Sequence, residues 1–111
     1  MKAAVFYGPE KGLRIEDVPI PKITPDQILV KVAACGVCHT DLHYLEHGVP
    51  TFKKPPIILG HEASGVVEEV GAHIAQFKKG QRVLIPAVLT CGHYAFCRMG
   101  RENICSNMTM L

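Results

Sequence analysis

The sequence predicts a small, mainly β fold with short helices and a cysteine-rich lobe at its C-terminal end. Three observations predict this class. Short strand-like stretches recur along the chain, 10 glycines and 8 prolines separate them, and the cysteines gather again after residue 90. Many short strands with such separators are typical of a β barrel. We therefore expect residues 1–111 to form one domain built on an incomplete barrel with one helix, and residues 90–111 to form its cysteine-rich lobe.

The first third of the chain is expected to be β structure. Residues 2–6 form a short apolar strand, and residues 13–18 alternate apolar and polar side chains as a half-buried strand does. Three prolines within residues 19–25 prevent regular ladder pairing, so this segment is a loop or an edge. Residues 27–34 are rich in β-branched side chains and are the strongest strand candidate.

The pattern becomes helical over residues 38–47. Apolar side chains recur there with polar ones between them, and Gly48 stands where a left-handed C-terminal cap belongs. A loop is expected at residues 53–56, and further strands at residues 66–70 and 81–85. Beyond residue 90 the sequence shows little periodicity.

The composition excludes several classes of protein. With 48% apolar and 20% charged residues, the chain is typical of a soluble globular domain. A net charge of +2 gives no basic face for nucleic acid and no polybasic tract for a membrane. The longest apolar stretch, residues 83–89, is too short to cross a bilayer, and no secretory signal is visible. We expect a cytoplasmic protein without nucleic-acid or membrane partners.

Five cysteines and six histidines supply many potential metal ligands. The odd number and low density of the cysteines argue against a disulfide scaffold. In a reducing compartment, clustered thiols are more often metal ligands or redox groups, and neutral imidazoles add donors for zinc. The spacing of these residues therefore decides which chemistry they favour.

A first group surrounds the start of the expected helix. Cys38 stands where exposed backbone N–H groups and the helix dipole favour a thiolate, which is a good zinc ligand or nucleophile. Thr40 and His43 share a helical face and could form a proton path. The alternative is a plain helix with surface histidines at 39, 43 and 47 and a buried, neutral cysteine.

A second group, His61 and Glu62, lies between glycines just before an expected strand. A single histidine is usually a partly buried side chain with one hydrogen bond, so this pair alone is a weak signal. Joined with Cys38, and with Asp41 as a carboxylate partner for an imidazole, it forms a mixed sulfur and nitrogen set suited to zinc.

A third group comprises Cys91, Cys97 and Cys105, which favour a structural metal lobe. A closed structural zinc site has four ligands, so three thiolates leave one position to fill, for which His93 is a candidate. The alternative is three free thiols in an irregular loop.

The sequence resembles the N-terminal catalytic domain of the zinc-dependent, medium-chain alcohol dehydrogenases, whose fold is a GroES-like β barrel. The resemblance extends along nearly the whole chain. Its most specific residues are Cys38-His39-Thr40-Asp41, Gly60-His61-Glu62 and the glycines Gly65, Gly71 and Gly80.

The resemblance implies a role for each ligand candidate. Cys38 and His61 correspond to ligands of the catalytic zinc, and Glu62 to the carboxylate that lies beside the metal and can coordinate it. Asp41 corresponds to the residue that orients the histidine ligand. Cys91, Cys97 and Cys105 correspond to ligands of a structural zinc.

The remaining roles concern proton and hydride transfer. The resemblance implies that Thr40 takes the proton from the alcohol, that His43 is the far end of that relay, and that His39 contacts the pyrophosphate of the cofactor. The expected chemistry is Lewis-acid activation of a small alcohol by zinc, with hydride transfer to NAD(P) and release of an aldehyde.

Two departures from the family pattern stand out. Tyr94 occupies the position of a cysteine in the structural-zinc lobe. Phenolate is a poor zinc ligand, so we expect that lobe to bind zinc weakly or not at all.

The chain also lacks a Gly-x-Gly-x-x-Gly turn and a Rossmann domain. The third catalytic ligand of the family lies beyond Leu111, so we expect a fragment or truncated product that is inactive alone and prone to self-association.

Two competing interpretations remain, and two others are disfavoured by the residues. A thiol redox module could use Cys35 and Cys38, although this would leave His61 without a role. The isolated chain could be a non-catalytic barrel that only folds and associates. Zinc-free quinone reductases share the fold but lack ligands equivalent to Cys38 and His61, and a zinc ribbon that binds nucleic acid would need paired Cys-x-x-Cys knuckles.

Overall fold

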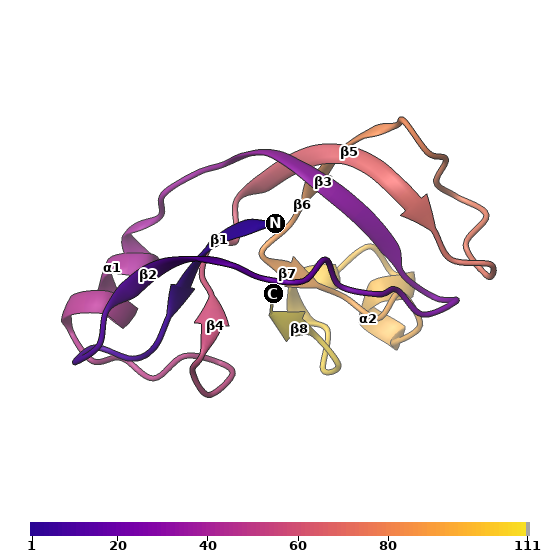
Figure 1. Cartoon of the computed structure of the whole chain (residues 1–111). Helices are drawn as coiled ribbons and strands as arrows, with labels where there is room; N and C mark the ends of the chain where they lie inside the picture. Colours follow the sequence, from indigo (N-terminus) through magenta and orange to yellow (C-terminus); the bar gives the residue numbers. More distant parts are fainter. Residues whose placement is uncertain (111) are drawn as a thin grey trace.

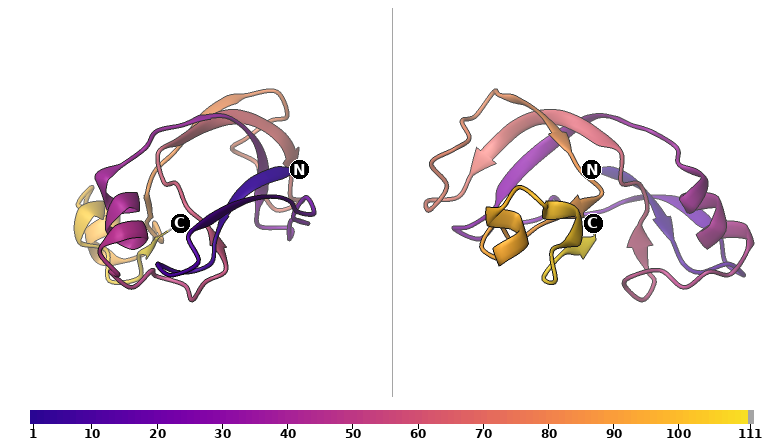
Figure 2. Two further views of the ribbon diagram at one scale, coloured as in Figure 1. Left: turned by 60° about the vertical axis from the view of Figure 1, so that its left-hand side comes forward. Right: turned by 180° about the vertical axis from the view of Figure 1, so that it is seen from behind.

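The computed structural model describes residues 1–110. Two long strands, β3 and β5, arch across the molecule, with helix α1 at one end and a lobe of short elements beneath them (Figure 1). The same arrangement is seen from behind in Figure 2. None of the helices in the described part of the chain is long and apolar enough to cross a membrane.

The strands form three separate antiparallel sheets, with the orders β2-β1-β4, β3-β5-β6 and β7-β8. Within residues 1–110 these sheets do not close into a barrel, and no parallel pairing occurs. The strands are β1 (Lys2–Phe6), β2 (Leu13–Asp17), β3 (Ile28–Cys35), β4 (Ile57–Ile58), β5 (Ala63–Val70), β6 (Arg82–Ile85), β7 (Val88–Leu89) and β8 (Thr109–Met110).

The pairing of β3 with β5 forms the centre of the fold. Cys35 at the end of β3 lies opposite Ala63 at the start of β5, and the register shifts twice along the pair, the second time between Val32 and Ala34. A Cβ at Gly65 would collide with the carbonyl oxygen of Lys31. Glycine at this position therefore lets the two backbones approach closely.

The buried core is small. Among the described residues, Val5 and Phe6 of β1 and Val67 of β5 are its buried aliphatic and aromatic side chains. Large apolar side chains elsewhere remain exposed, among them Leu84 of β6, which is 84% exposed, and Ile15 of β2, which is 72% exposed. The sheets therefore present apolar surface to the outside as well as to the core.

The expected mainly β fold with short helices is confirmed, and most of the expected elements are present. Helix α1 (His39–Glu46) begins one residue after Cys38, which is its N-cap, and Gly48 follows it with a φ of 65°. Strand β5 begins at Ala63, three residues before the expected start, because Ser64 and Gly65 also pair with β3.

The segment after residue 90 contains more regular structure than its sequence pattern indicated. It folds into helix α2 (Ala95–Arg98), the 3-10 helix η1 (Glu102–Ile104) and strand β8, which pairs with β7. Each element has two to four residues, which is too short to produce a visible period in the sequence.

Candidate metal centres

The first candidate centre lies where two chain junctions meet. One junction leads from β3 into α1, and the other leads from β4 into β5. The N–H of Gly36 donates a hydrogen bond to the carbonyl oxygen of Glu62 at 3.1 Å, which continues the β3–β5 pairing beyond the strand ends. The sheet therefore brings Cys38 to His61, although these residues lie far apart in the sequence.

Cys38, His61 and Glu62 form a cluster, called here the mixed cluster. The Cys38 sulfur, a ring nitrogen of His61 and a carboxylate oxygen of Glu62 all lie within 4.8 Å of one another. Cys38 and His61 are half-buried, and Glu62 is exposed. Sulfur, imidazole and carboxylate donors in this number match a catalytic zinc site, which uses three protein ligands and leaves one position open.

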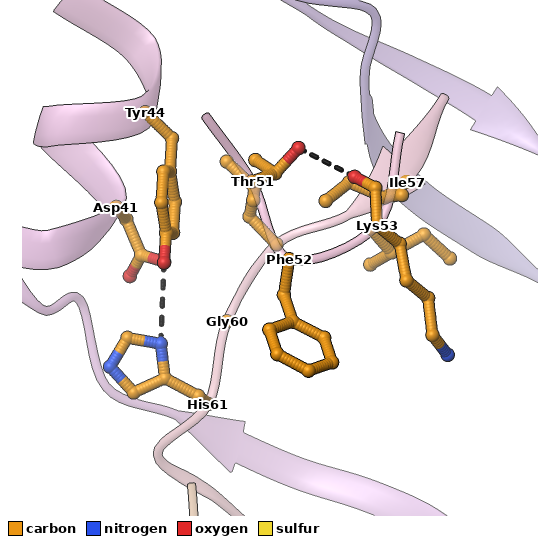
Figure 3. A pocket seen from close by; sticks show the side chains of 10 residues that line it. Asp41, Tyr44, Thr51, Phe52, Lys53, Ile57, Gly60 and His61 are labelled. Atoms are coloured by element: carbon orange, nitrogen blue, oxygen red, sulfur yellow. Dashed lines mark hydrogen bonds and ion pairs between the residues drawn. The ribbon is translucent and has the colours of Figure 1, made fainter. Parts of the chain in front are cut away.

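Asp41 supports both sides of the mixed cluster. Its Oδ2 accepts a hydrogen bond from the N–H of Cys38 at 3.1 Å. Its Oδ1 lies 3.6 Å from Nδ1 of His61 (Figure 3). This oxygen is buried and has no hydrogen-bond partner among the described residues, a situation that costs free energy unless a donor reaches it.

A zinc ion bound to His61 would explain the position of Asp41. A proton on Nδ1 of His61 would point toward the unpartnered oxygen and would leave Nε2 with a lone pair for a metal. A carboxylate that orients a ligating histidine in this way is the usual support of a zinc site. The residues of the mixed cluster therefore fit a zinc ion.

Gly36 shapes the mixed cluster in a way that the sequence analysis missed. A Cβ at this position would collide with the carboxylate of Glu62. The absence of a side chain leaves room for Glu62 beside Cys38. The signal in the sequence is a glycine between a strand and a cysteine N-cap, which becomes informative only when the opposing residue is known.

Thr40 and His43 lie on successive turns of α1 without a direct link. The hydroxyl of Thr40 lies 3.6 Å from the Cys38 sulfur, whose S–H donates a hydrogen bond to it. Within residues 1–110, no hydrogen bond joins Thr40 to His43. The His43 ring instead lies between the rings of His39 and His47, with centroid separations of 4.8 Å and 5.2 Å.

A cavity of about 290 Å³ borders the mixed cluster. Asp41 and Tyr44 line it from α1, and Thr51 and Phe52 line it from the following loop (Figure 3). The hydroxyl of Thr51 donates a 2.6 Å hydrogen bond to the carbonyl oxygen of Lys53, which stabilises that loop. His61 also lines the cavity, next to Asp41, so the cavity borders an imidazole of the mixed cluster.

The second candidate centre is the thiol cluster of Cys91, Cys97 and Cys105. Its three sulfurs lie within 4.8 Å of one another, and Cys97 and Cys105 are buried. The Cys105 thiol contacts the Cys91 sulfur at 3.5 Å, and all five cysteines of the chain are free thiols. The structure thus brings together the three sulfurs that the sequence singled out.

The local surroundings shift the pKa values of Cys97 and Cys105 in opposite directions. Burial raises the pKa of Cys97 from 9.0 to about 11, with a further rise from its hydrogen bond to Cys105. A backbone hydrogen bond at Cys91 lowers the pKa of Cys105 from 9.0 to about 7. Cys105 therefore ionises more readily than Cys97 near neutral pH.

Tyr94 contributes its backbone to the thiol cluster. Its N–H donates a hydrogen bond to the Cys91 sulfur at 3.3 Å. Its ring is 37% exposed and makes an edge contact with Phe96, with centroids 5.6 Å apart. Among the described residues, His93 adds no fourth ligand atom within 4.8 Å of the three sulfurs.

A cluster of potential metal ligands at the junctions of antiparallel strands, with a separate thiol lobe, is the arrangement that the sequence resemblance to the zinc-dependent medium-chain alcohol dehydrogenases implies. Residues 24–111 match the alcohol dehydrogenase GroES-like domain, and the chain belongs to this family. The family resemblance inferred from the sequence is thereby confirmed.

Individual relatives agree with this assignment. The chain is 46% identical over 106 residues to an alcohol dehydrogenase of Geobacillus stearothermophilus, covering 95% of this chain and 32% of that protein. It is 41% identical over 113 residues to a sorbitol dehydrogenase of Bacillus subtilis, covering 100% of this chain and 32% of that protein. This chain therefore spans about a third of the length of these curated relatives.

A solved structure gives the same result. A zinc-binding dehydrogenase of Sinorhizobium meliloti, bound to NADP, superposes with a TM-score of 0.81 at 36% identity. The match covers 99% of this chain and 31% of that one.

Proposed function

We propose that residues 1–111 are the N-terminal zinc-binding catalytic domain of an alcohol dehydrogenase, an oxidoreductase that transfers hydride from a small alcohol to NAD(P). The convergence of Cys38, His61 and Glu62, with Asp41 behind the imidazole, carries this proposal. The alcohol and sorbitol dehydrogenases among the relatives support an alcohol or aldehyde as substrate.

Each residue of the mixed cluster has a distinct role in this proposal. Cys38 and His61 hold the zinc ion, and the exposed Glu62 lies close enough to enter its coordination. Asp41 fixes the imidazole of His61 in its ligating orientation and anchors the N–H of Cys38. When bound, zinc supplies a Lewis acid that lowers the pKa of an alcohol hydroxyl.

Thr40 is the residue that accepts the proton of the alcohol. Its hydroxyl is half-buried and hydrogen-bonded to the Cys38 sulfur at 3.6 Å, which places it beside the ligand set. His43 is exposed one turn further along α1 and passes the proton to water, and His39 binds the pyrophosphate of the cofactor. The absence of a direct bond between Thr40 and His43 in the described residues requires a bridging group between them.

Residues 90–111 form a weak structural-zinc lobe in this proposal. Three thiols supply soft donors, but Tyr94 takes the place of a fourth cysteine. A site that lacks one thiolate loses both negative charge and a preferred donor. We expect the thiol cluster to bind zinc more weakly than a four-cysteine lobe does.

We expect no steady alcohol oxidation from the 111-residue chain by itself. Its sequence contains no Gly-x-Gly-x-x-Gly turn to bind a dinucleotide. Incubation with ethanol and NAD, followed by NADH absorbance, measures this directly. Steady turnover by the pure chain would contradict the expectation.

The exposed apolar strands favour association of this chain with another protein surface. Leu84 and Ile15 are 84% and 72% exposed, although apolar side chains of this size are usually covered. We expect homo-oligomers at high concentration. Sedimentation velocity across a hundredfold concentration range tests this, and a monomer at every concentration contradicts it.

Cobalt titration tests the zinc site that underlies the proposed function. Thiolate ligation of Co²⁺ gives a charge-transfer band in the near ultraviolet, and we expect Cys38→Ser and His61→Ala to weaken its binding at one site. Cys35→Ser is the matched control, because Cys35 lies outside both clusters. Unchanged Co²⁺ binding in Cys38→Ser and His61→Ala would overturn the assignment.

A further inference from the structure

The thiol cluster draws its three cysteines from separate parts of the C-terminal lobe. Cys91 comes two residues after β7, Cys97 lies in α2 (Figure 1), and Cys105 directly follows η1. The thiol of Cys105 donates a hydrogen bond to the Cys91 sulfur at 3.5 Å. The two ends of residues 91–105 therefore already meet through their sulfurs, as a pair that can be bridged without a large backbone movement.

The thiol cluster lacks the donor set of a closed structural zinc site. Such a site uses four ligands, whereas among residues 1–110 no further histidine, cysteine or carboxylate joins the three sulfurs within 4.8 Å. Tyr94 directs its backbone N–H at the Cys91 sulfur, and its ring is partly exposed. Three thiolates hold a metal ion less firmly than four, so these thiols are less protected from other thiol chemistry.

Burial gives the contacting thiols different access to solvent. Cys91 is half-buried, whereas Cys105 is 2% exposed and Cys97 is 7% exposed. Of the three, Cys91 is therefore the thiol that a dissolved reagent reaches first. A solvent-accessible thiol with a second thiol beside it is the usual arrangement of a redox-sensing pair.

We propose that Cys91 and Cys105 are an oxidisable pair, which a low-molecular-weight disulfide such as glutathione disulfide converts into an intramolecular disulfide. Cys91 is the attacking thiol, and Cys105 is the resolving thiol. In a reducing compartment this bond forms only when the thiol pool becomes oxidised, so the pair acts as a redox-sensitive switch. The inference does not depend on the dehydrogenase activity proposed above, because neither residue belongs to the mixed cluster.

Two exchange steps account for the atoms and electrons. The Cys91 thiolate attacks one sulfur of glutathione disulfide, whose S–S bond breaks and releases one glutathione thiolate. The Cys105 thiolate then attacks the Cys91 sulfur of this mixed disulfide and displaces the second glutathione thiolate. The two protons that the cysteines lose pass through water to the two glutathione thiolates. The cysteine pair is thereby oxidised by two electrons, and glutathione disulfide is reduced by the same two.

The disulfide removes the thiol cluster as a metal site. The thiolate is the form of cysteine that binds metal ions, and neither sulfur of a disulfide is a thiolate. Cys97 is then the remaining thiol of the cluster, and one thiol is too few for a zinc site. The new bond instead closes residues 91–105 into a covalent loop, which restricts the unfolded chain. Oxidation therefore exchanges metal binding in the lobe for a covalent crosslink.

Peptide mapping of the unsubstituted chain tests the pair. The metal-free chain is equilibrated with glutathione and glutathione disulfide at several ratios, and the remaining thiols are alkylated under denaturing conditions. Trypsin cleaves after Arg98 and Arg101, so a bond from Cys91 to Cys105 joins two peptides, and fragmentation distinguishes Cys91 from Cys97. We expect this bond, with Cys97 alkylated. A bond that contains Cys97, or no intramolecular bond at any ratio, would overturn the proposal.

Three variants separate the attacking thiol from the resolving thiol. Cys105→Ser is expected to stop at the mixed disulfide, so that glutathione accumulates on Cys91. Cys91→Ser is expected to react in the lobe at least about tenfold more slowly, because its remaining thiols are buried. Cys97→Ala is the matched control and keeps the disulfide. Its loss in Cys97→Ala, or the absence of glutathione on Cys91 in Cys105→Ser, contradicts the assigned roles.

A metal readout follows the consequence of the disulfide without any substitution. The stoichiometry of Co²⁺ binding is measured at saturating Co²⁺ for the reduced chain, for the oxidised chain and after treatment with dithiothreitol. We expect the oxidised chain to bind at least one Co²⁺ ion fewer, and dithiothreitol to restore the lost ion. An unchanged stoichiometry in a chain whose disulfide has been mapped contradicts the switch.

Discussion

The mixed cluster and the thiol cluster each bring three ligand atoms within 4.8 Å, but they do so by different routes. The mixed cluster joins two junctions that β3 and β5 hold side by side, and a buried carboxylate supports it. The thiol cluster forms within residues 91–105, around two very short helices, and its sulfurs contact one another and the local backbone.

The comparison shows two ways to position metal ligands: contacts between distant segments position the mixed cluster, and local contacts position the thiol cluster. The geometry of the mixed cluster depends on strand pairing, on Gly36 and on Asp41, all of which lie outside the ligand set. The geometry of the thiol cluster depends on its own loop and on buried thiols. The mixed cluster is also partly open to solvent, because Glu62 is exposed, whereas Cys97 and Cys105 of the thiol cluster are buried.

The largest expected effect is a selective loss of zinc from the mixed cluster in His61→Ala. Removing a ligand should weaken zinc binding there by more than about a hundredfold, beyond the loss expected for a supporting residue. The thiol cluster should keep its affinity, because none of its contacts involve His61. Competition with a chromogenic chelator measures both affinities, and His73→Ala is the control. Equal losses at the two clusters would contradict their independence.

Tyr94→Cys should strengthen the thiol cluster. The backbone of residue 94 already reaches the Cys91 sulfur at 3.3 Å, so a thiol here can complete a four-sulfur set. We expect tighter zinc binding by about a hundredfold or less at this cluster, and no change at the mixed cluster. Native mass spectrometry gives the occupancy, and Tyr94→Phe is the matched control. A Cys variant that binds zinc no better than the Phe variant would show that position 94 cannot ligate.

Asp41→Asn should weaken zinc binding at the mixed cluster alone. The neutral amide keeps the shape of the side chain but removes the charge that faces Nδ1 of His61 at 3.6 Å. Loss of such a partner typically lowers metal affinity about 10–100-fold. Asp26→Asn is the control, because Asp26 pairs with the exposed His73 and neither residue belongs to a cluster. The chelator assay applies, and an unchanged affinity would remove Asp41 from the site.

Gly65→Ala should disturb the mixed cluster through the sheet. The added Cβ would collide with the carbonyl oxygen of Lys31, so β3 and β5 must separate locally. Overpacking of this kind costs about 1–3 kcal/mol. We expect a lower midpoint in urea, and zinc loss at the mixed cluster greater than at the thiol cluster. Ser64→Ala, on the same strand, is the control. Equal zinc loss at both clusters would indicate global unfolding instead.

The smallest expected effect concerns the β1–β2 hairpin, which belongs to neither cluster. The hydrogen bond that the Tyr7 hydroxyl donates to Glu16 at 3.0 Å raises the pKa of Tyr7 above 10.0. A raised pKa means that this bond stabilises the fold below pH 10 and that the contribution disappears as pH rises through the raised value. Melting temperatures of the chain and of Tyr7→Phe should therefore converge above pH 10. A constant difference would contradict this.

Local patterns in the sequence were sufficient to predict the positions of several strands and of helix α1. Alternation of side chains located β2, and Cys38 with Gly48 located the two ends of α1. The start of β5 was missed because Gly65 has a low strand propensity, and its pairing depends on close contact with β3. The two-residue strands β7 and β8 exist only through their mutual pairing, which no local pattern records.

The candidate site was predictable in its residues but not in its geometry. Taken separately, Cys38 and His61 were weak signals; donor chemistry joined them into a candidate zinc set, and the family resemblance then supported that set. Their actual meeting depends on the β3–β5 register, which is a long-range property. The orphaned Oδ1 of Asp41 and the steric role of Gly36 become visible only when the opposing side chains are in place.

The register shift near the end of β3 limits how this motif can be transplanted. An extra residue lies between Val32 and Ala34 without a partner on β5, so the remaining residues of β3 change phase relative to the sheet. In a regular strand, a one-residue slip turns every following side chain to the opposite face. A designer who grafts β3 together with Cys38 to Asp41 onto another scaffold must therefore copy this irregularity as well, since an idealised strand would change the pairing of every β3 residue after the shift.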